Sequence, residues 1–294
     1  MNLITKTKCF VLLFMAMQTF SYSQIIKKDS SMKILKTTSK TIVFVHGLFV
    51  NPTSWAKWKT YFESKGYTCY TPANPYHEGI PADLRANINP KLSKVGFEDV
   101  VNNIVKLIDS LHEKPIVIGH SLAGLVVQKL VEMGKASAGI CIDGAVPKNI
   151  LPPLRTVKTM FPVIQPFSGN SPYVATKKWF HFAFCTTLTK EESDKVYDEI
   201  CVPESRRIPR ETLYKSFAKI NLKKPHSPLL FIGGEKDNII PARLSKKNAE
   251  AYKDKNSISD FKEFKGKCHY ICGQDGWQEV ADYILNWLAS IKAQ

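Results

Sequence analysis

Short runs of apolar and β-branched residues alternate with longer amphipathic stretches along most of the chain. Apolar runs of about four to eight residues are typical of buried strands, and apolar residues recurring every third or fourth position are typical of helices that cover a sheet. The predicted strands are residues 41–46, 67–71, 116–118, 138–142, 229–233 and 260–264. The predicted helices are residues 55–65, 97–111, 122–133, 241–252 and 277–291. This alternation predicts an α/β fold with a mostly parallel sheet flanked by helices.

The alternation is interrupted between residues 148 and 227. Prolines and aromatic residues are frequent there, and the clearest regular element is an amphipathic helix at 189–200. A segment of this length is too long for a simple loop in a compact domain. We therefore predict a core built from residues 24–147 and 228–294, with residues 148–227 forming an inserted lid.

The first 23 residues have the pattern of a secretory signal peptide. Lys6 and Lys8 precede an apolar run at 9–20, and Ser21 and Ser23 place small side chains before a cleavage site. The apolar run is short for a membrane span. We expect the chain to be exported to the periplasm or secreted, with an uncleaved N-terminal anchor as the alternative.

The charge and the cysteines limit which binding partners, metals and disulfides the chain is expected to have. The formal net charge is +15, but the basic residues are dispersed and form no nucleic-acid-binding module. The charge favours weak association with anionic surfaces and gives no reason to expect a nucleic-acid partner. Of the seven cysteines only Cys9 lies in the predicted signal peptide, and none of the others has zinc-ligand spacing. Cys268 and Cys272 are either free thiols or a disulfide pair.

A candidate nucleophile lies between a predicted strand and a predicted helix. Residues 119–124 read GHSLAG and place Ser121 at the turn. A sharp strand-to-helix turn exposes a serine hydroxyl and directs the first helical N–H groups at a developing negative charge. The sequence resembles the α/β-hydrolase superfamily, whose turn reads G-x-S-x-G. Ala123 replaces the last glycine of that pattern, and Gly124 follows it directly.

The resemblance also assigns an oxyanion hole. In this superfamily one donor lies in the loop after the first strand of the core, and the other is the residue after the nucleophile. These positions correspond to the backbone N–H groups of Leu48, with Phe49 as an alternative, and of Leu122. His46 in the same loop is interpreted as a structural anchor.

The acid and base follow late predicted strands. The superfamily order of serine, acid and histidine assigns the acid to Asp237, which precedes a short apolar step and Pro241, and the base to His269. Asp143, which follows the strand at 138–142, is the competing acid. Ser–His–acid chemistry needs no metal and no cofactor, and we predict neither.

The predicted function is hydrolysis of carboxylic esters of small molecules through an acyl-enzyme on Ser121, as in esterases and lipases. A cofactor-free haloperoxidase, perhydrolase or lyase using the same three residues is the alternative, because fold does not fix function. A non-catalytic binding protein is a third, less favoured reading. The sequence leaves the oligomeric state open.

Aromatic side chains are the candidates for the substrate pocket. The candidate pocket residues are Phe49, Trp179, Phe180, His181 and Phe184. Aromatic side chains are common in pockets that bind apolar ligands. A run of them inside an insertion is equally compatible with the core of a small lid, and the sequence does not separate these two interpretations.

Overall fold

The computed structural model describes residues 39–293, so the predicted signal peptide at 1–23 lies outside the described residues. Among the described helices, none combines the length and the apolarity that crossing a bilayer requires.

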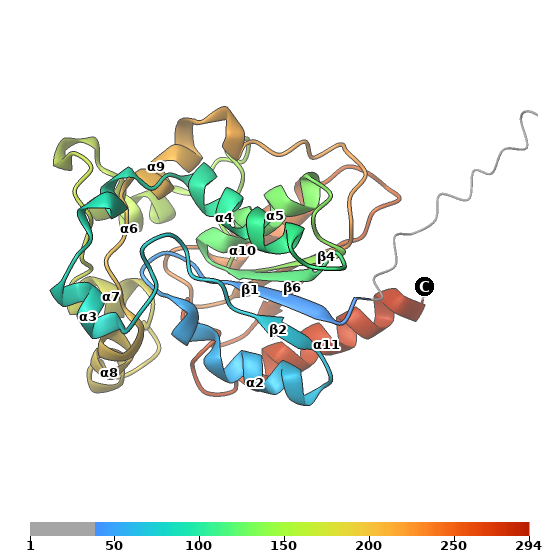
Figure 1. Cartoon of the computed structure of the whole chain (residues 1–294), viewed down its shortest axis with the longest axis horizontal. Helices are drawn as coiled ribbons and strands as arrows, with labels where there is room; N and C mark the ends of the chain where they lie inside the picture. Colours follow the sequence, from blue (N-terminus) through green and yellow to red (C-terminus); the bar gives the residue numbers. More distant parts are fainter. Residues whose placement is uncertain (1–38, 294) are drawn as a thin grey trace, which may run out of the picture. The chain divides into compact units, whose positions relative to one another are not determined.

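Six parallel strands form one sheet in the order β2-β1-β3-β4-β5-β6 (Figure 1). The strands are β1 (Thr41–Val45), β2 (Thr68–Tyr70), β3 (Ile116–His120), β4 (Ala138–Ile142), β5 (Leu229–Gly234) and β6 (Ser259–Phe264). Strand β1 pairs with β2 on one side and with β3 on the other, so the chain extends the sheet first in one direction and then in the other. Because all the strands are parallel, their carboxyl ends lie at one edge of the sheet, where open α/β sheets bind their ligands.

Helices cover both faces of the sheet. The helices α2 (Ala56–Ser64) and α11 (Trp277–Ala293) pack on one face, and α4 (Phe97–Asp109), α5 (Leu122–Glu132) and α10 (Ala242–Ala251) pack on the other. Strand β1 shows the alternation that produces this division. Ile42 and Phe44 belong to the first core, while Val43 and Val45 belong to the second, because successive side chains of a strand point to opposite faces.

The predicted fold class is confirmed, with each predicted core strand and helix present to within a few residues. The six-residue helix α3 (Pro81–Ala86), in the connection between β2 and α4, was not predicted. A helix this short offers too few positions for a helical period to be recognised. Pro81 begins it, at a position where proline is favoured because the first helical N–H has no partner within the helix.

The connection between β4 and β5 is helical. It contains α6 (Leu154–Ile164), α7 (Lys177–Ala183), α8 (Lys190–Ile200) and α9 (Arg207–Tyr214), which we call the helical segment. The helix predicted at 189–200 is α8. Its start is defined by a capping box, in which the Thr189 hydroxyl accepts from the Glu192 N–H at 3.2 Å and the Glu192 carboxylate accepts from the Thr189 N–H at 2.8 Å.

Helix α3 is attached to the end of α8. The Arg85 guanidinium donates to the backbone carbonyls of Tyr197 at 3.3 Å, Asp198 at 3.0 Å and Cys201. These carbonyls lie at the C-terminal end of α8, where the last carbonyls of a helix lack partners within it. Tyr197 O is shared, because it also accepts from the Cys201 N–H at 2.9 Å. One cation therefore joins two segments that are distant in the sequence.

The cysteines of residues 39–293 are all buried free thiols. No disulfide joins Cys268 to Cys272, so the bridge considered from the sequence is not formed. The Cys268 sulfur instead lies 3.1 Å from Gln274 Oε1, and the carbonyl of Cys272 accepts a hydrogen bond from the Trp58 indole at 2.7 Å.

Helix α5 lies so close to β3 and to the residues after β4 that two positions, Gly119 and Gly124, have no room for a side chain. A Cβ at Gly119 would lie 2.5 Å from the Ala123 carbonyl oxygen, and one at Gly124 would lie 2.4 Å from the Cα of Gly144. Ala123 is fully buried, and its methyl group is accommodated. The turn around Ser121 therefore needs glycine at positions 119 and 124, and it tolerates alanine at 123.

We expect Gly124→Ala to lower the free energy of unfolding by about 2–3 kcal/mol, because the new methyl group would overlap rigid backbone. Gly134→Ala is the control, since a Cβ there meets no atom within 4 Å. That change should cost only about 1 kcal/mol, from the left-handed backbone of Gly134. Urea unfolding measures both variants, and equal losses would contradict the close approach.

Candidate active site

Ser121 lies in a strained turn between β3 and α5. It adopts φ 58° and ψ −123°, a conformation rare for residues other than glycine. Three backbone hydrogen bonds hold it there: its N–H donates to Ile142 O at 2.9 Å, and its carbonyl accepts from Gly124 N at 2.9 Å and Ala145 N at 2.8 Å. Strand β4 and the residues that follow it therefore fix the turn.

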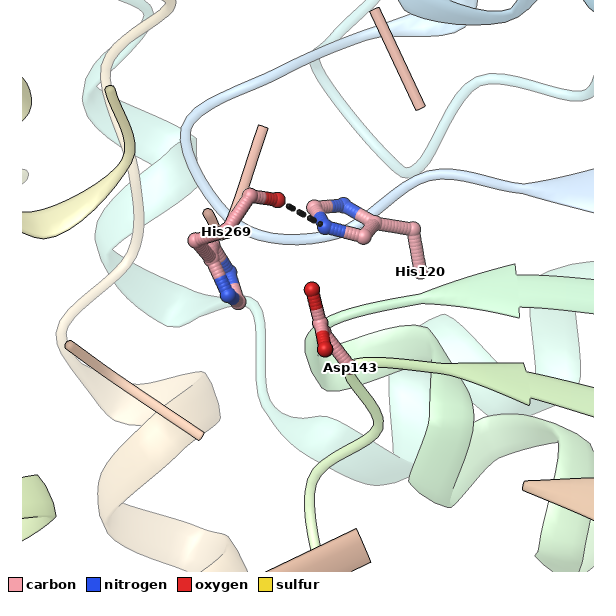
Figure 2. A group of neighbouring side chains, drawn as sticks. All are labelled: His120, Asp143 and His269. Carbon is pink, nitrogen blue, oxygen red and sulfur yellow. Dashed lines mark hydrogen bonds between the residues drawn. The ribbon is translucent and has the colours of Figure 1, made fainter. Parts of the chain in front are cut away.

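His269 lies in the loop between β6 and α11, next to the end of β3. The His120 side chain donates from Nε2 to the carbonyl of His269 at 2.8 Å, and the two rings are 4.7 Å apart (Figure 2). Burial lowers the pKa of His120 well below its usual value, and the neighbouring His269 lowers it further. His120 is therefore a neutral side chain that positions the His269 backbone.

The histidine loop also contacts the helical segment. The Tyr270 N–H donates to the carbonyl of Phe184, the residue after α7, at 2.9 Å. The Phe184 ring packs edge-on against the His269 ring at 4.8 Å. His269 is therefore positioned from the sheet on one side and from the helical segment on the other.

Asp237 lies in the loop after β5. Its Oδ1 accepts hydrogen bonds from the N–H groups of Ile239 at 2.6 Å and Ile240 at 2.9 Å. These bonds fix the orientation of the carboxylate and leave Oδ2 available for another partner. Glu235 in the same loop is turned elsewhere and accepts from the Gly266 N–H at 3.0 Å.

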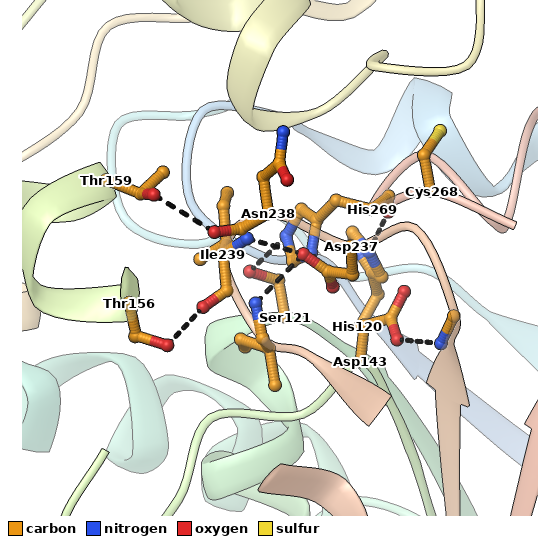
Figure 3. A network of polar contacts seen from close by, with 12 residues as sticks. His120, Ser121, Asp143, Thr156, Thr159, Asp237, Asn238, Ile239, Cys268 and His269 are labelled. Atoms are coloured by element: carbon orange, nitrogen blue, oxygen red, sulfur yellow. Dashed lines mark hydrogen bonds and ion pairs between the residues drawn. The ribbon is translucent and has the colours of Figure 1, made fainter. Parts of the chain in front are cut away.

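The structure brings Ser121, Asp237 and His269 into one hydrogen-bonded chain (Figure 3). Asp237 Oδ2 lies 2.6 Å from His269 Nδ1, and His269 Nε2 lies 2.9 Å from Ser121 Oγ. All three are nearly inaccessible to solvent, with Ser121 the most exposed at 6%. This is the geometry in which a histidine can accept a serine proton while a carboxylate stabilises the imidazolium.

Asp143 does not contact His269 in this way. Its Oδ1 accepts from the Gly234 N–H at 2.6 Å, and its buried Oδ2 has no donor among residues 39–293. Burial raises the pKa of Asp143 well above its usual value, and the charge of Asp237 raises it further. Both effects favour the neutral form of Asp143, and Asp237 is the carboxylate that contacts His269.

The donor atoms of His120, Asp143 and His269 lie within 4.8 Å of one another, a spacing that could hold a cation. Both ring nitrogens of His269, however, already contact Asp237 and Ser121. A cation would have to displace these hydrogen bonds, so we assign no metal to this cluster.

The loop after β1 is anchored by His46. The His46 ring accepts at Nε2 from the Asn74 N–H at 2.9 Å and donates from Nδ1 to the Gly47 carbonyl at 2.9 Å. Burial and the neighbouring His77 lower the pKa of His46 to about 3, so its ring is neutral. The structural interpretation of His46 agrees with these contacts.

The two candidate oxyanion donors lie beside Ser121. Leu48 and Leu122 both line the cavity that Ser121 faces. Leu122 is the first residue of α5, so its N–H has no partner within the helix. Phe49, the alternative donor, is already engaged, because its N–H donates to Glu204 Oε2 at 3.2 Å. The geometry therefore favours the N–H of Leu48 over that of Phe49 as the oxyanion donor from this loop.

A buried pair, Glu204 and His77, supports this loop and was missed from the sequence. His77 Nε2 lies 3.3 Å from Glu204 Oε2. Burial opposes a charged imidazole, but the Glu204 carboxylate outweighs it and raises the pKa of His77. The pair holds Phe49 at φ 65° by accepting its N–H. Both residues lie in irregular connections, where no periodicity indicates which side chains meet.

An apolar cavity of about 180 Å³ opens beside Ser121. Its lining is mainly aliphatic and comes from the ends of β1 and β4, from α6 and α9, and from the loop after Asp237. Among the lining residues are Leu48, Leu122, Ile150, Met160, Ile239 and Ile240. Such a lining suits an apolar substrate group held near the serine.

Two of the five predicted pocket residues, Phe49 and Phe184, line this cavity. Trp179, Phe180 and His181 do not, and this part of the prediction differs from the structure. The Phe180 ring is fully buried and stacks on Phe184 at 4.7 Å, while the Trp179 indole donates to the Thr159 carbonyl at 2.9 Å.

These contacts make Trp179 and Phe180 part of the internal core of the helical segment. The partly exposed His181 belongs to the same helix, α7, outside the cavity lining. A sequence run of aromatic residues cannot show which of its members face a cavity, because neighbouring residues of a helix point in different directions.

The sheet order, the strained serine turn and the hydrogen-bonded serine, histidine and aspartate define an α/β-hydrolase-type protein. The model of the alpha/beta hydrolase family matches residues 42–282, and the chain belongs to this family. No curated protein sequence matches the chain.

Solved structures show the same fold. A monoacylglycerol lipase from Paleococcus ferrophilus is 20% identical, with a TM-score of 0.61 over 87% of this chain and 97% of the other. A methylesterase from Arabidopsis is 15% identical, with a TM-score of 0.61 over 85% and 98%. An extracellular alpha/beta-hydrolase from a Paenibacillus species is 18% identical, with a TM-score of 0.62 over 84% and 98%. At these identities the likeness establishes the fold alone.

The raised pKa of Asp143 predicts how the free energy of unfolding depends on pH. Because the folded chain keeps this proton to higher pH than the unfolded chain, the wild type loses free energy of unfolding as pH rises above about 4. Asp143→Asn cannot titrate there. As pH rises, we expect the free energy of unfolding of Asp143→Asn to increase relative to that of wild type by up to about 1.4 kcal/mol per pH unit. The increase should stop once the pH passes the raised pKa of Asp143.

Urea unfolding at about pH 5, 6.5 and 8 measures this difference. The control is Glu235→Gln, at an exposed acid whose pKa is lowered by the hydrogen bond from Gly266 N–H. A lowered pKa affects stability only as pH falls toward it, so this control should show a constant difference over the same range. A constant difference for Asp143→Asn would show that Asp143 is ionised in the folded chain.

Proposed function

We propose that this chain is a serine hydrolase that cleaves carboxylic esters through an acyl-enzyme on Ser121. The observation that carries the proposal is the continuous Asp237–His269–Ser121 hydrogen-bonded chain beside an apolar cavity. Solved structures with the same fold, a monoacylglycerol lipase and a methylesterase among them, support ester hydrolysis as the reaction.

In the proposed mechanism, His269 Nε2 removes the hydroxyl proton while Ser121 Oγ attacks the ester carbonyl. The N–H groups of Leu48 and Leu122 stabilise the oxyanion, and Asp237 stabilises the imidazolium. His269 then protonates the leaving alcohol. A water molecule, activated by the same histidine, attacks the acyl-enzyme and releases the acid.

The cavity suits an apolar acyl group. Its aliphatic walls offer few hydrogen-bond partners to a polar substrate, and they begin directly beside Ser121. We further propose that residues 148–227 act as a lid, because α6 and α9 supply part of these walls. Export of the chain remains a prediction from residues 1–23.

Covalent labelling of the purified chain with a fluorophosphonate tests the nucleophile. We expect labelling of wild type and of Ser64→Ala, a control at an exposed serine outside the site, and none of Ser121→Ala. Asp237→Asn should lower kcat by on the order of 10⁴-fold, because the carboxylate no longer fixes the histidine tautomer. A folded wild type that does not react would contradict the proposal and favour a binding protein.

A series of p-nitrophenyl esters from acetate to palmitate tests the substrate class. We expect kcat/KM to rise from acetate to medium acyl chains, because each buried methylene contributes about 0.8 kcal/mol. Halogenation and perhydrolysis are measured on the same samples. Rates of these reactions above those of ester cleavage would favour the haloperoxidase or perhydrolase alternative, which uses the same three residues.

A further inference from the structure

The helical segment carries exposed apolar side chains around the opening of the Ser121 cavity. Leu151, Val157 and Leu213 line the cavity and are also exposed to solvent. On α6, Leu154 and Phe161 lie three residues before and four residues after Val157, a spacing that places all three on one side of the helix. We call these five side chains the entrance surface.

The entrance surface is strongly exposed. The exposed fractions are 78% for Leu151, 67% for Leu154 and 54% for Phe161. Single exposed apolar residues need no explanation, but a cluster rimmed by polar residues is typical of a surface that binds a partner. Its position at the opening places such a partner next to the cavity.

The sequence around α6 carries only positive charges. Between Asp143 and Glu191 the sequence contains six lysines and arginines and no acidic residue. Two of the six, Arg155 and Lys158, lie on α6, are exposed and form no ion pair with any of residues 39–293. They line one surface depression together with apolar and polar neighbours, namely Leu154, Thr159 and Phe182.

We propose that the entrance surface binds an anionic lipid layer. Leu154 and Phe161 enter the boundary between headgroups and acyl chains, while Arg155 and Lys158 contact the headgroup phosphates. A second copy of the chain is a poorer partner, because two such surfaces would bring like charges together. The inference goes beyond the proposed function, since this binding requires no hydrolysis.

Binding to lipid vesicles tests the proposal in the Ser121→Ala background, so that hydrolysis cannot alter the vesicles. The vesicles contain phosphatidylcholine alone or phosphatidylcholine mixed with phosphatidylglycerol, and co-sedimentation measures the bound fraction. We expect tighter binding to the mixed vesicles, weakened by added salt, because headgroup charge contributes to the affinity.

Two variants separate the apolar and the charged contributions. Leu154→Asp with Phe161→Asp should lower the affinity for mixed vesicles by more than tenfold. Arg155→Gln with Lys158→Gln should lower it by about thirtyfold, at about 1 kcal/mol for each cation, and should remove most of the salt dependence. Met133→Asp, at an exposed apolar residue at the far end of α5 from Ser121, is the control and should bind like the parent chain.

The same substitutions in the active chain should leave hydrolysis of p-nitrophenyl acetate unchanged, because none of these four residues lines the cavity. Vesicle binding that is absent, or that is unchanged in both double variants, would overturn the proposal. The proposal would also be overturned if the chain dimerised in lipid-free buffer and the Leu154→Asp, Phe161→Asp double variant did not. That result would assign the surface to a second copy of the chain. Failure of ester hydrolysis alone would not affect the binding result.

Discussion

The site depends on the strained backbone of Ser121. A positive φ at a serine costs of order 1–3 kcal/mol, and it persists only where the surroundings fix it. Here β4 and the residues that follow it fix this conformation, since Ile142 and Ala145 hydrogen-bond to the Ser121 backbone. Gly119 and Gly124 allow α5 to approach. The hydroxyl is thereby placed where His269 can reach it.

The acid and base loops are positioned as much by the helical segment as by the sheet. On α6, the Thr156 hydroxyl donates to the Ile239 carbonyl at 2.7 Å and the Thr159 hydroxyl donates to the Asn238 carbonyl at 3.0 Å (Figure 3). The Asn238 side chain donates to the Phe182 carbonyl of α7 at 2.8 Å. A displacement of α6 or α7 would therefore act directly on the loop that carries Asp237.

Local patterns in the sequence predicted most of the core, because strand and helix periods and the turn around Ser121 are local properties. The resemblance assigned the acid to Asp237 and kept Asp143 as a competitor. Three-dimensional distances then showed which carboxylate contacts His269, since both acids follow strands whose carboxyl ends meet at the same edge. Glu204 could not be predicted, because its partners lie far away in the sequence and in irregular connections. The aromatic run at 179–184 was only partly assigned, since its amphipathic pattern does not distinguish a cavity wall from a helical core.

The most direct test of the account is to detect the acyl-enzyme itself. The purified chain is mixed with p-nitrophenyl butyrate, quenched in acid within the first turnovers and analysed by intact mass and peptide mapping. The account predicts a butyryl adduct on the peptide containing Ser121, formed with a burst of p-nitrophenol and absent from Ser121→Ala. Ester turnover without an adduct on this peptide, or with an adduct on another residue, would contradict it.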